Sequence, residues 1–164
     1  METTEPRSRT HTWQDPVALA SHVPELSGLE FLVRIAAGEL PPPPIASLMG
    51  FEIVEAERGR VVFEAEPAEW MFNPIGSVHG GVAATLLDSC MGCAVQSVLE
   101  AGSGYTTTDL HVRYVRGMSL DTGRVLATGT VVHAGRRQAT AEGKLVAEAT
   151  GKLIATGTSA CIIL

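Results

Sequence analysis

The feature that most constrains the fold is an apolar run over residues 80–99 that contains one charged side chain, Asp88. A run of this length predicts a single helix about 30 Å long. Because the run is apolar on nearly every side, we expect a sheet to cover one side and a second copy of the chain the other. An isolated carboxylate is costly to bury unless something requires it there. Asp88 is therefore the first candidate for a functional residue.

A membrane span would have a similar length, but other features of the sequence favour a soluble protein. The run contains three glycines and several polar side chains, and neither flank carries a basic cluster. The net charge of −6 and the pI near 5.3 argue against a nucleic-acid partner. The first sixteen residues are polar and lack the apolar segment of a signal peptide. We therefore expect a cytoplasmic protein with neither membrane nor nucleic acid as a partner.

Alternation of apolar and polar residues predicts six strands in the rest of the chain. They cover residues 51–57, 61–66, 106–116, 125–132, 138–149 and 153–162. Short connections that contain glycine separate the last four, which we expect to be consecutive antiparallel neighbours. The predicted fold class is α+β, with an antiparallel sheet of five to six strands around one long central helix.

The N-terminal quarter of the chain differs from this pattern. Residues 1–27 predict a loose or partner-docked arm, whereas apolar residues at helical spacing predict a helix over 29–36, after Ser27 as N-cap. The prolines of residues 41–44 predict a stiff spacer. We therefore divide the chain into an N-terminal arm, helix and spacer over residues 1–44 and a sheet-and-helix domain over residues 45–164.

The predicted central helix has a face with space beside Asp88. At 100° per residue, that face is made mostly of small side chains. It comprises Gly81, Ala84, Thr85, Met91, Gly92 and Val95, and the opposite, sheet-packing face comprises Ala83, Leu86, Cys90, Cys93 and Ala94. Space beside a buried acid fits a substrate channel, and it fits a close contact between helices of two subunits equally well.

The residues before the helix favour the channel. Gly80 and Gly81 allow close approach to the backbone and leave the first N–H groups of the helix free. Such donors, aided by the helix dipole, suit a carbonyl oxygen that gains negative charge. Asn73 and His79 are nearby polar groups that would position a substrate or water.

A Cys-x-x-Cys pattern at Cys90 and Cys93 predicts core packing. It begins about ten residues into the helix, far from the N-terminus where the dipole lowers a thiol pKa. Cys161 and the scattered histidines show no ligand spacing, so no metal site is predicted.

Several stretches together resemble a known family. NPIGSVHGG followed by VAATLLD, then YTTTDLHVRYVRG and VVHAGRRQATAEGKLVAEATGKLIATGT, are similar to the hotdog-fold acyl-CoA thioesterases of the phenylacetate-pathway (PaaI-like) type. The similarity covers about residues 45–162. It implies a hotdog fold and hydrolysis of an acyl-CoA substrate, with no cofactor besides the coenzyme A of that substrate.

The resemblance also implies residue roles. Asp88 would be the general base or the nucleophile, and Gly80 and Gly81 would polarise the thioester carbonyl. Asn73 would orient water and substrate, while His79 would fix the loop or assist the carbonyl.

A hydroxyl on the strand after the helix would complete the water site. Matching by position selects Thr107, whereas strand parity with Leu110 favours Thr106 or Thr108.

The resemblance further implies that Gly135, Arg136 and Arg137 meet the coenzyme A phosphates, and two arginines beside a glycine suit phosphate oxygens. An ordinary solvated hairpin is the alternative, and Arg113 and Arg116 are weaker candidates.

We expect a homo-oligomer, at least a dimer and by preference a dimer of dimers. Two other functions stay open: a hotdog-fold acyl-thioester dehydratase or hydratase, and a non-catalytic acyl-CoA-binding module.

Overall fold

A computed structural model describes residues 5–164 and contains one six-stranded antiparallel sheet. Its strands are β1 (Phe51–Glu57), β2 (Arg60–Ala65), β3 (Tyr105–Tyr114), β4 (Val125–Ala134), β5 (Gln138–Ala147) and β6 (Leu153–Ile163). The spatial order is β1-β2-β4-β5-β6-β3, so β1 and β3 form the two edges. The predicted antiparallel sheet is confirmed.

One predicted pairing is wrong. We expected β3 and β4 to be neighbours, but β3 pairs with β6, and β4 lies between β2 and β5. β3 ends at Tyr114 and β4 begins at Val125, so the connection is longer than a tight turn and contains the 3-10 turn η2 (Leu120–Thr122). A connection of this length can cross from the sheet edge to its middle, which a hairpin cannot do.

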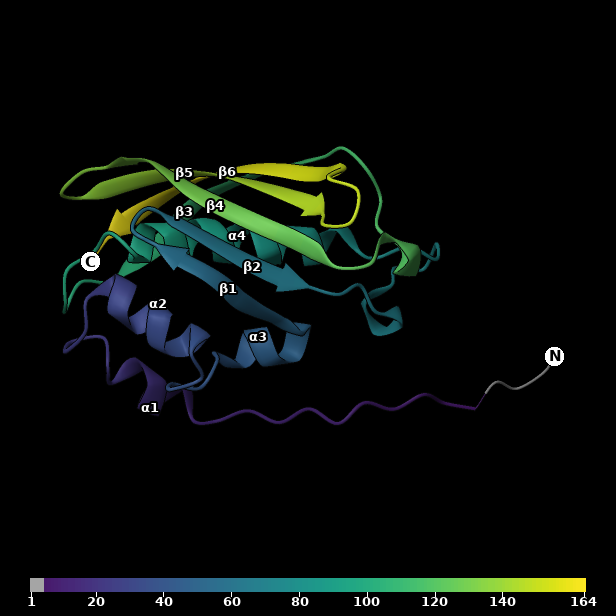
Figure 1. Cartoon of the computed structure of the whole chain (residues 1–164), viewed down its shortest axis with the longest axis horizontal. Coiled ribbons are helices and arrows are strands. Elements are labelled where there is room, and N and C mark those ends of the chain that lie inside the picture. The colour runs from purple at the N-terminus through teal and green to yellow at the C-terminus, as the bar shows by residue number, and fades with distance from the viewer. Residues whose placement is uncertain (1–4) are drawn as a thin grey trace.

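The central helix is α4 (Gly80–Gln96), which is 17 residues long and ends three residues before the predicted boundary. It contacts β2 to β6, and Figure 1 shows the sheet lying over it. The helices α2 and α3 lie below β1 in the same view. This is the hotdog fold that the resemblance implies. Within residues 5–164, no helix combines the length and apolar character needed to cross a membrane.

Three glycines in register allow α4 to pack closely on the sheet. Gly129 pairs with Gly143, and Gly143 pairs with Gly157, so the three form a row across β4, β5 and β6. A Cβ atom at Gly129 would lie 2.2 Å from the carbonyl oxygen of Cys90, and one at Gly143 or Gly157 would lie 3.0 Å from the Met91 side chain. A larger residue at Gly129 would collide with the helix backbone, and one at Gly143 or Gly157 would displace the Met91 side chain.

Three short helices precede the sheet: α1 (Pro16–Ala20), α2 (Gly28–Ala36) and α3 (Pro44–Met49). The predicted N-cap of α2 is confirmed, because Ser27 and Glu30 form a reciprocal capping box. Leu32 is buried in the same core as α4. α2 therefore covers part of the core near β1 and α4.

The other two helices correct the sequence analysis. Asp15 caps α1 and Pro16 begins it, while Pro44, which we assigned to a spacer, begins α3. Proline is tolerated in the first turn, where the missing N–H would be unpaired anyway. Leu19 is buried, so the part of the arm around α1 packs against the rest of the chain. Residues 1–4 of the predicted arm lie outside the described residues, and the division at residue 44 stays a prediction.

Candidate active site

A cleft of about 1550 Å³ lies between α4 and the N-terminal helices. One wall is formed by residues of α4 and the start of β3, and the other by apolar residues of α2 and α3. The first wall includes Asp88, Ser89, Cys93, Tyr105 and Thr107, and the second includes Phe31, Leu32, Ile35, Ile45 and Ala46. The predicted space beside Asp88 therefore exists as a cleft lined mostly by apolar residues. Asp88 lies in its α4 wall, and five glutamates also belong to its lining: Glu39, Glu52, Glu64, Glu66 and Glu148.

The exposed face of α4 is rotated from the predicted one. The residues of α4 that stay partly open form a single stripe: Gly80, Gly81, Ala84, Thr85, Asp88, Ser89 and Cys93. Met91 and Val95, predicted beside Asp88, are fully buried, and Cys93 lines the cleft instead of packing on the sheet. The glycine row accounts for this rotation, because it offers the Met91 side chain its space. A helical wheel alone does not show which side the sheet can accommodate.

Asp88 is held by a hydrogen bond from the neighbouring strand. The Thr107 hydroxyl donates to Asp88 Oδ1 at 3.0 Å. A β-bulge between Thr107 and Asp109 shifts the register of β3 against β6. Parity counted from Leu110 therefore does not extend across the bulge to Thr106 and Thr108. Both of these side chains are exposed, and the Thr108 hydroxyl donates to the carbonyl of Ala160.

The thiols near Asp88 are poor nucleophiles. Burial, followed by the charge of Asp88, raises the pKa of Cys93 to about 12, although the neighbouring Tyr105 hydroxyl opposes the shift. Burial also raises the pKa of Cys90 and of Tyr105. Neutral thiols react slowly and bind metals weakly. Over residues 5–164, no three His, Cys, Asp or Glu side chains are grouped as a metal site would require.

Asn73 shapes the loop of residues 72–79 that leads into α4. Its side-chain oxygen accepts hydrogen bonds from the Ile75 and Ser77 N–H groups, both at 3.1 Å, and its amide nitrogen donates to the Ser77 hydroxyl at 3.0 Å. Gly76 completes the turn with a φ of 83°. The Asn73 oxygen is thus already engaged within the loop. Ser77, which makes two of these hydrogen bonds with Asn73, was not among the predicted site residues.

His79 is the N-cap of α4. The ring Nδ1 of His79 accepts a hydrogen bond from the Gly81 N–H at 2.9 Å. The backbone N–H of His79 donates to the carbonyl of Met71 at 2.8 Å. An accepting Nδ1 carries no proton, so in this geometry the ring N–H is at Nε2. The ring is exposed, and its free Nε2–H is a donor beside the start of the helix.

The two glycines at the start of α4 have structural partners of their own. A Cβ atom at Gly81 would lie 2.9 Å from His79 Nδ1, and one at Gly80 would lie 3.2 Å from the Tyr114 ring. The Tyr114 hydroxyl also donates to the Gly80 carbonyl at 3.2 Å. With the Gly81 N–H occupied, the Gly80 N–H is a first-turn donor that has no partner among residues 5–164. Sequence analysis missed Tyr114.

Gly80 and Asp88 do not meet within one copy of the chain. They are eight residues apart on α4, which places them about 12 Å apart along the helix axis. A reacting carbonyl group lies about 3 Å from each catalytic group that contacts it. A single carbonyl group therefore cannot contact both residues of the same copy.

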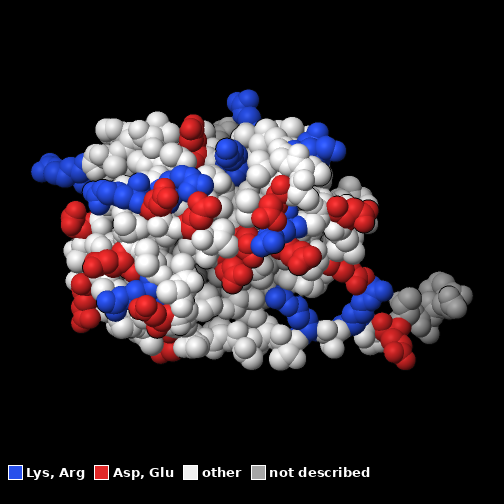
Figure 2. Space-filling model, in the orientation of Figure 1, with Lys and Arg blue, Asp and Glu red and all other residues white. Residues whose placement is uncertain are grey.

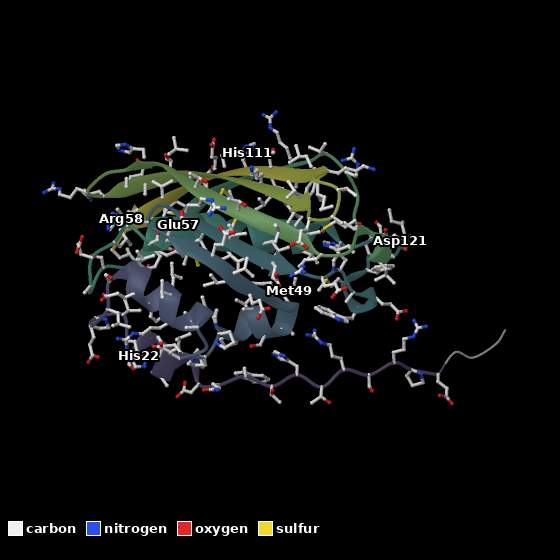
Figure 3. All side chains as sticks on the ribbon, viewed as in Figure 1. His22, Met49, Glu57, Arg58, His111 and Asp121 are labelled. Atoms are coloured by element: carbon white, nitrogen blue, oxygen red, sulfur yellow. The ribbon has the colours of Figure 1, made fainter. Side chains whose placement is uncertain are left out.

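The candidate phosphate-binding residues lie elsewhere. Gly135, Arg136 and Arg137 connect β4 to β5, both arginines are exposed, and none of the three lines the cleft. His111 also has no place in the cleft, because it points from β3 away from α4 (Figure 3). On the face drawn in Figure 2, basic and acidic side chains are interspersed.

Sequence comparison gives the family of this fold and site. The thioesterase superfamily model matches residues 75–154. Human acyl-coenzyme A thioesterase 13 is 34% identical over 104 residues, covering 58% of this chain and 73% of that protein. A 1,4-dihydroxy-2-naphthoyl-CoA hydrolase of Listeria monocytogenes is 29% identical over 100 residues, covering 61% and 80%. A candidate esterase of Halobacterium salinarum is 33% identical over 103 residues, covering 60% of this chain and just under two thirds, 66%, of that protein.

Solved structures agree. A phenylacetic acid degradation-related protein from Ralstonia eutropha JMP134 superposes with a TM-score of 0.71 at 27% identity, covering 80% of this chain and 98% of that one. Zebrafish thioesterase superfamily member 2 gives a TM-score of 0.68 at 29% identity, covering 84% and 99%. A Streptococcus mutans UA159 protein bound to acetyl-CoA gives 0.63 at 25% identity, covering 70% and 88%. The chain therefore belongs to the thioesterase superfamily.

Proposed function

We propose that this protein hydrolyses an acyl-CoA thioester and that Asp88 is its catalytic carboxylate. The observation that carries the proposal is the placement of Asp88, bonded to Thr107, in the wall of a largely apolar cleft. The human and Listeria relatives are named for acyl-CoA hydrolysis, and the Streptococcus relative binds acetyl-CoA. An apolar cleft suits the acyl group, and a carboxylate beside it suits activation of water.

The reaction needs few groups. In one form, Asp88 accepts a proton from water as the water oxygen bonds to the carbonyl carbon; in the other, Asp88 attacks that carbon itself and water later releases the acyl group. Negative charge builds on the carbonyl oxygen, where an N–H donor at the start of α4 stabilises it. The carbon–sulfur bond then breaks, and coenzyme A leaves as a thiolate without needing a strong acid. The free acid forms directly in the first form, and in the second it forms when water hydrolyses the anhydride on Asp88.

We further propose that a second copy of the chain completes the site. One thioester cannot contact both Gly80 and Asp88 of one copy, which are about 12 Å apart along the helix. The Gly80 N–H of one copy would face Asp88 of the other, with His79 beside it. Arg136 and Arg137 remain our candidates for the coenzyme A phosphates, and no separate cofactor is needed.

Replacing Asp88 tests the proposal. We expect Asp88→Asn to lower kcat by at least about 100-fold, because amide nitrogen neither accepts the proton nor attacks the carbonyl. Thiol release from a panel of aryl, short-chain and long-chain acyl-CoAs measures this effect. Asp121→Asn is the matched control, since Asp121 is exposed in η2 and does not line the cleft.

Unchanged turnover in Asp88→Asn would show that Asp88 is not the catalytic carboxylate. Two other outcomes would point to the alternative functions. Hydration of an enoyl-CoA without thiol release would indicate a hydratase, and tight acyl-CoA binding without any turnover would indicate a binding module.

A further inference from the structure

The N-terminal strap, which we define as residues 5–15, is an extended segment attached to the body at a few points. It runs beneath α3 toward α1 in Figure 1 and is exposed along nearly its whole length. It belongs to no sheet, and Figure 2 shows basic side chains between it and the main body, at the lower right. The strap also precedes the region that matches the family, which begins at residue 75.

Arg9 is the main anchor of the strap. Its guanidinium donates to the carbonyl oxygen of Leu48 at 2.7 Å and to that of Ser47 at 3.4 Å. Both carbonyls belong to the last turn of α3, where no helical N–H is available to them. The same guanidinium lies 3.8 Å from the centroid of the Trp70 ring, as in a cation–π contact. Arg9 therefore joins α3 to the 3-10 turn η1 (Glu69–Met71).

A second contact supports the same connection. Arg7 forms an ion pair with Glu69, the first residue of η1. This pair is exposed and therefore weak on its own. Both arginines of the strap therefore contact η1, and Arg9 also contacts α3.

From η1, hydrogen bonds lead directly to the start of α4. The Met71 carbonyl accepts from the His79 N–H at 2.8 Å, and Phe72 pairs with Val78 across the loop. His79 in turn caps α4 through the Gly81 N–H. The position of η1 therefore sets the position of the loop of residues 72–79 and of the N–H donors that follow it.

We propose that Arg9 is a positioning residue for these donors, acting through Trp70 and η1. It fixes the loop of residues 72–79 relative to α3, whose residues Ile45 to Ser47 line the acyl cleft. This role rests on the proposed thioesterase function, because the donors matter only if they polarise a substrate carbonyl. The strap then couples the wall that holds the acyl group to the groups that act on its carbonyl.

Kinetics of Arg9 variants test the role. We expect Arg9→Gln to lower kcat by about tenfold with a change in KM of less than about twofold, because the lost alignment matters in the transition state. The kcat of Arg9→Lys should lie between those of the wild type and Arg9→Gln, since lysine keeps the charge but lacks the planar guanidinium. Arg34→Gln is the control: it removes an exposed arginine of α2 that lies 4.0 Å from Glu39. Equal kcat in wild type and Arg9→Gln would overturn the proposal.

Hydrogen exchange provides a readout that does not need activity. We expect faster amide exchange over residues 71–81 in Arg9→Gln, as well as in the strap and α3, which Arg9 contacts directly, and unchanged exchange in the sheet and the rest of α4. Unchanged exchange over residues 71–81, or faster exchange spread over the whole chain, would overturn the positioning role. In a Trp13→Phe background, Trp70 is the remaining tryptophan, so its emission should change when Arg9 is replaced. If the wild type released no thiol from any acyl-CoA, the proposed function would fail, while exchange and emission would still decide whether Arg9 positions the loop.

Discussion

Asp88 and Thr107 meet because of one irregularity in β3. The bulge after Thr107 turns its hydroxyl toward α4, where it donates to one carboxylate oxygen of Asp88. A hydrogen bond to a charged group contributes about 1.5–3 kcal/mol. It also restricts the rotation of the carboxylate, which favours a fixed angle of approach to a substrate.

We expect Thr107→Val to lower kcat by about tenfold or more, because the isosteric side chain removes the donor and leaves Asp88 free to rotate. Thr107→Ser should keep most of the activity, since it retains the hydroxyl. The measurement is the rate of thiol release from the best acyl-CoA. Thr106→Val serves as the control on the same strand, as Thr106 is exposed. Equal rates for Thr107→Val and wild type would contradict the assigned role.

At this scale, sequence and resemblance together selected Asp88 and a threonine of the next strand, but they left Thr106, Thr107 and Thr108 as alternatives. What they did not reveal were contacts between residues distant in sequence. The Tyr114 hydroxyl reaches Gly80 only because β3 and the start of α4 are adjacent in space. The engagement of Asn73 within its own loop depends on Ser77, whose orientation no periodicity predicts.

Among the elements, the contact between α4 and the sheet has the strictest steric requirement. The glycine row removes three side chains under the helix and lets Met91 fill the space. A methyl group at Gly129 would meet helix backbone, which cannot move aside as a side chain can.

We expect Gly129→Ala to lower the free energy of unfolding by about 1–3 kcal/mol or more, the usual effect of overpacking. For a chain of this size, that corresponds to a fall in Tm of roughly 3–10 °C. Thermal unfolding followed by circular dichroism measures it. Gly117→Ala is the control, because a Cβ atom there would meet nothing within 4 Å. A Tm in Gly129→Ala equal to that of Gly117→Ala would contradict the close packing.

Element type was more predictable than element pairing. Alternation identified all six strands, and the single apolar run identified α4. The pairing of β3 with β6 depends on the route of the connection between β3 and β4, about which alternation carries no information. α1 and α3 were missed because they are too short to show periodicity, and only their proline starts and the cap at Asp15 mark them.

At the scale of the whole molecule, two open surfaces among residues 5–164 bear on the proposed second copy. One is the open stripe of α4 that includes Asp88, and the other is the free edge of β3. The proposed second copy would place a second α4 against the stripe. It would also bring a Gly80 N–H near each Asp88, so that two copies would form two sites.

Subunit mixing tests this arrangement. Asp88→Asn and His79→Ala should each be nearly inactive, but hybrids of the two would contain one site with both residues intact. Random assortment of equal amounts into dimers should restore about a quarter of wild-type activity. The measurement is thiol release after co-expression or joint refolding, with each variant refolded alone as the control. Activity that stays at the mean of the two parents would exclude a shared site.

The glycine row has a consequence for how the cleft accommodates substrates of different size. A helix whose backbone rests on the backbone of the sheet cannot slide across it or move closer without a collision, so the position of Asp88 relative to β4, β5 and β6 is restricted. The opposite wall is made of short helices and apolar side chains on segments with few such restraints. Any adjustment of the cleft to substrates of different size is therefore expected in the wall formed by α2 and α3. If the proposed function holds, we expect substitutions in α2 and α3 to change the acyl preference while Asp88 keeps its position.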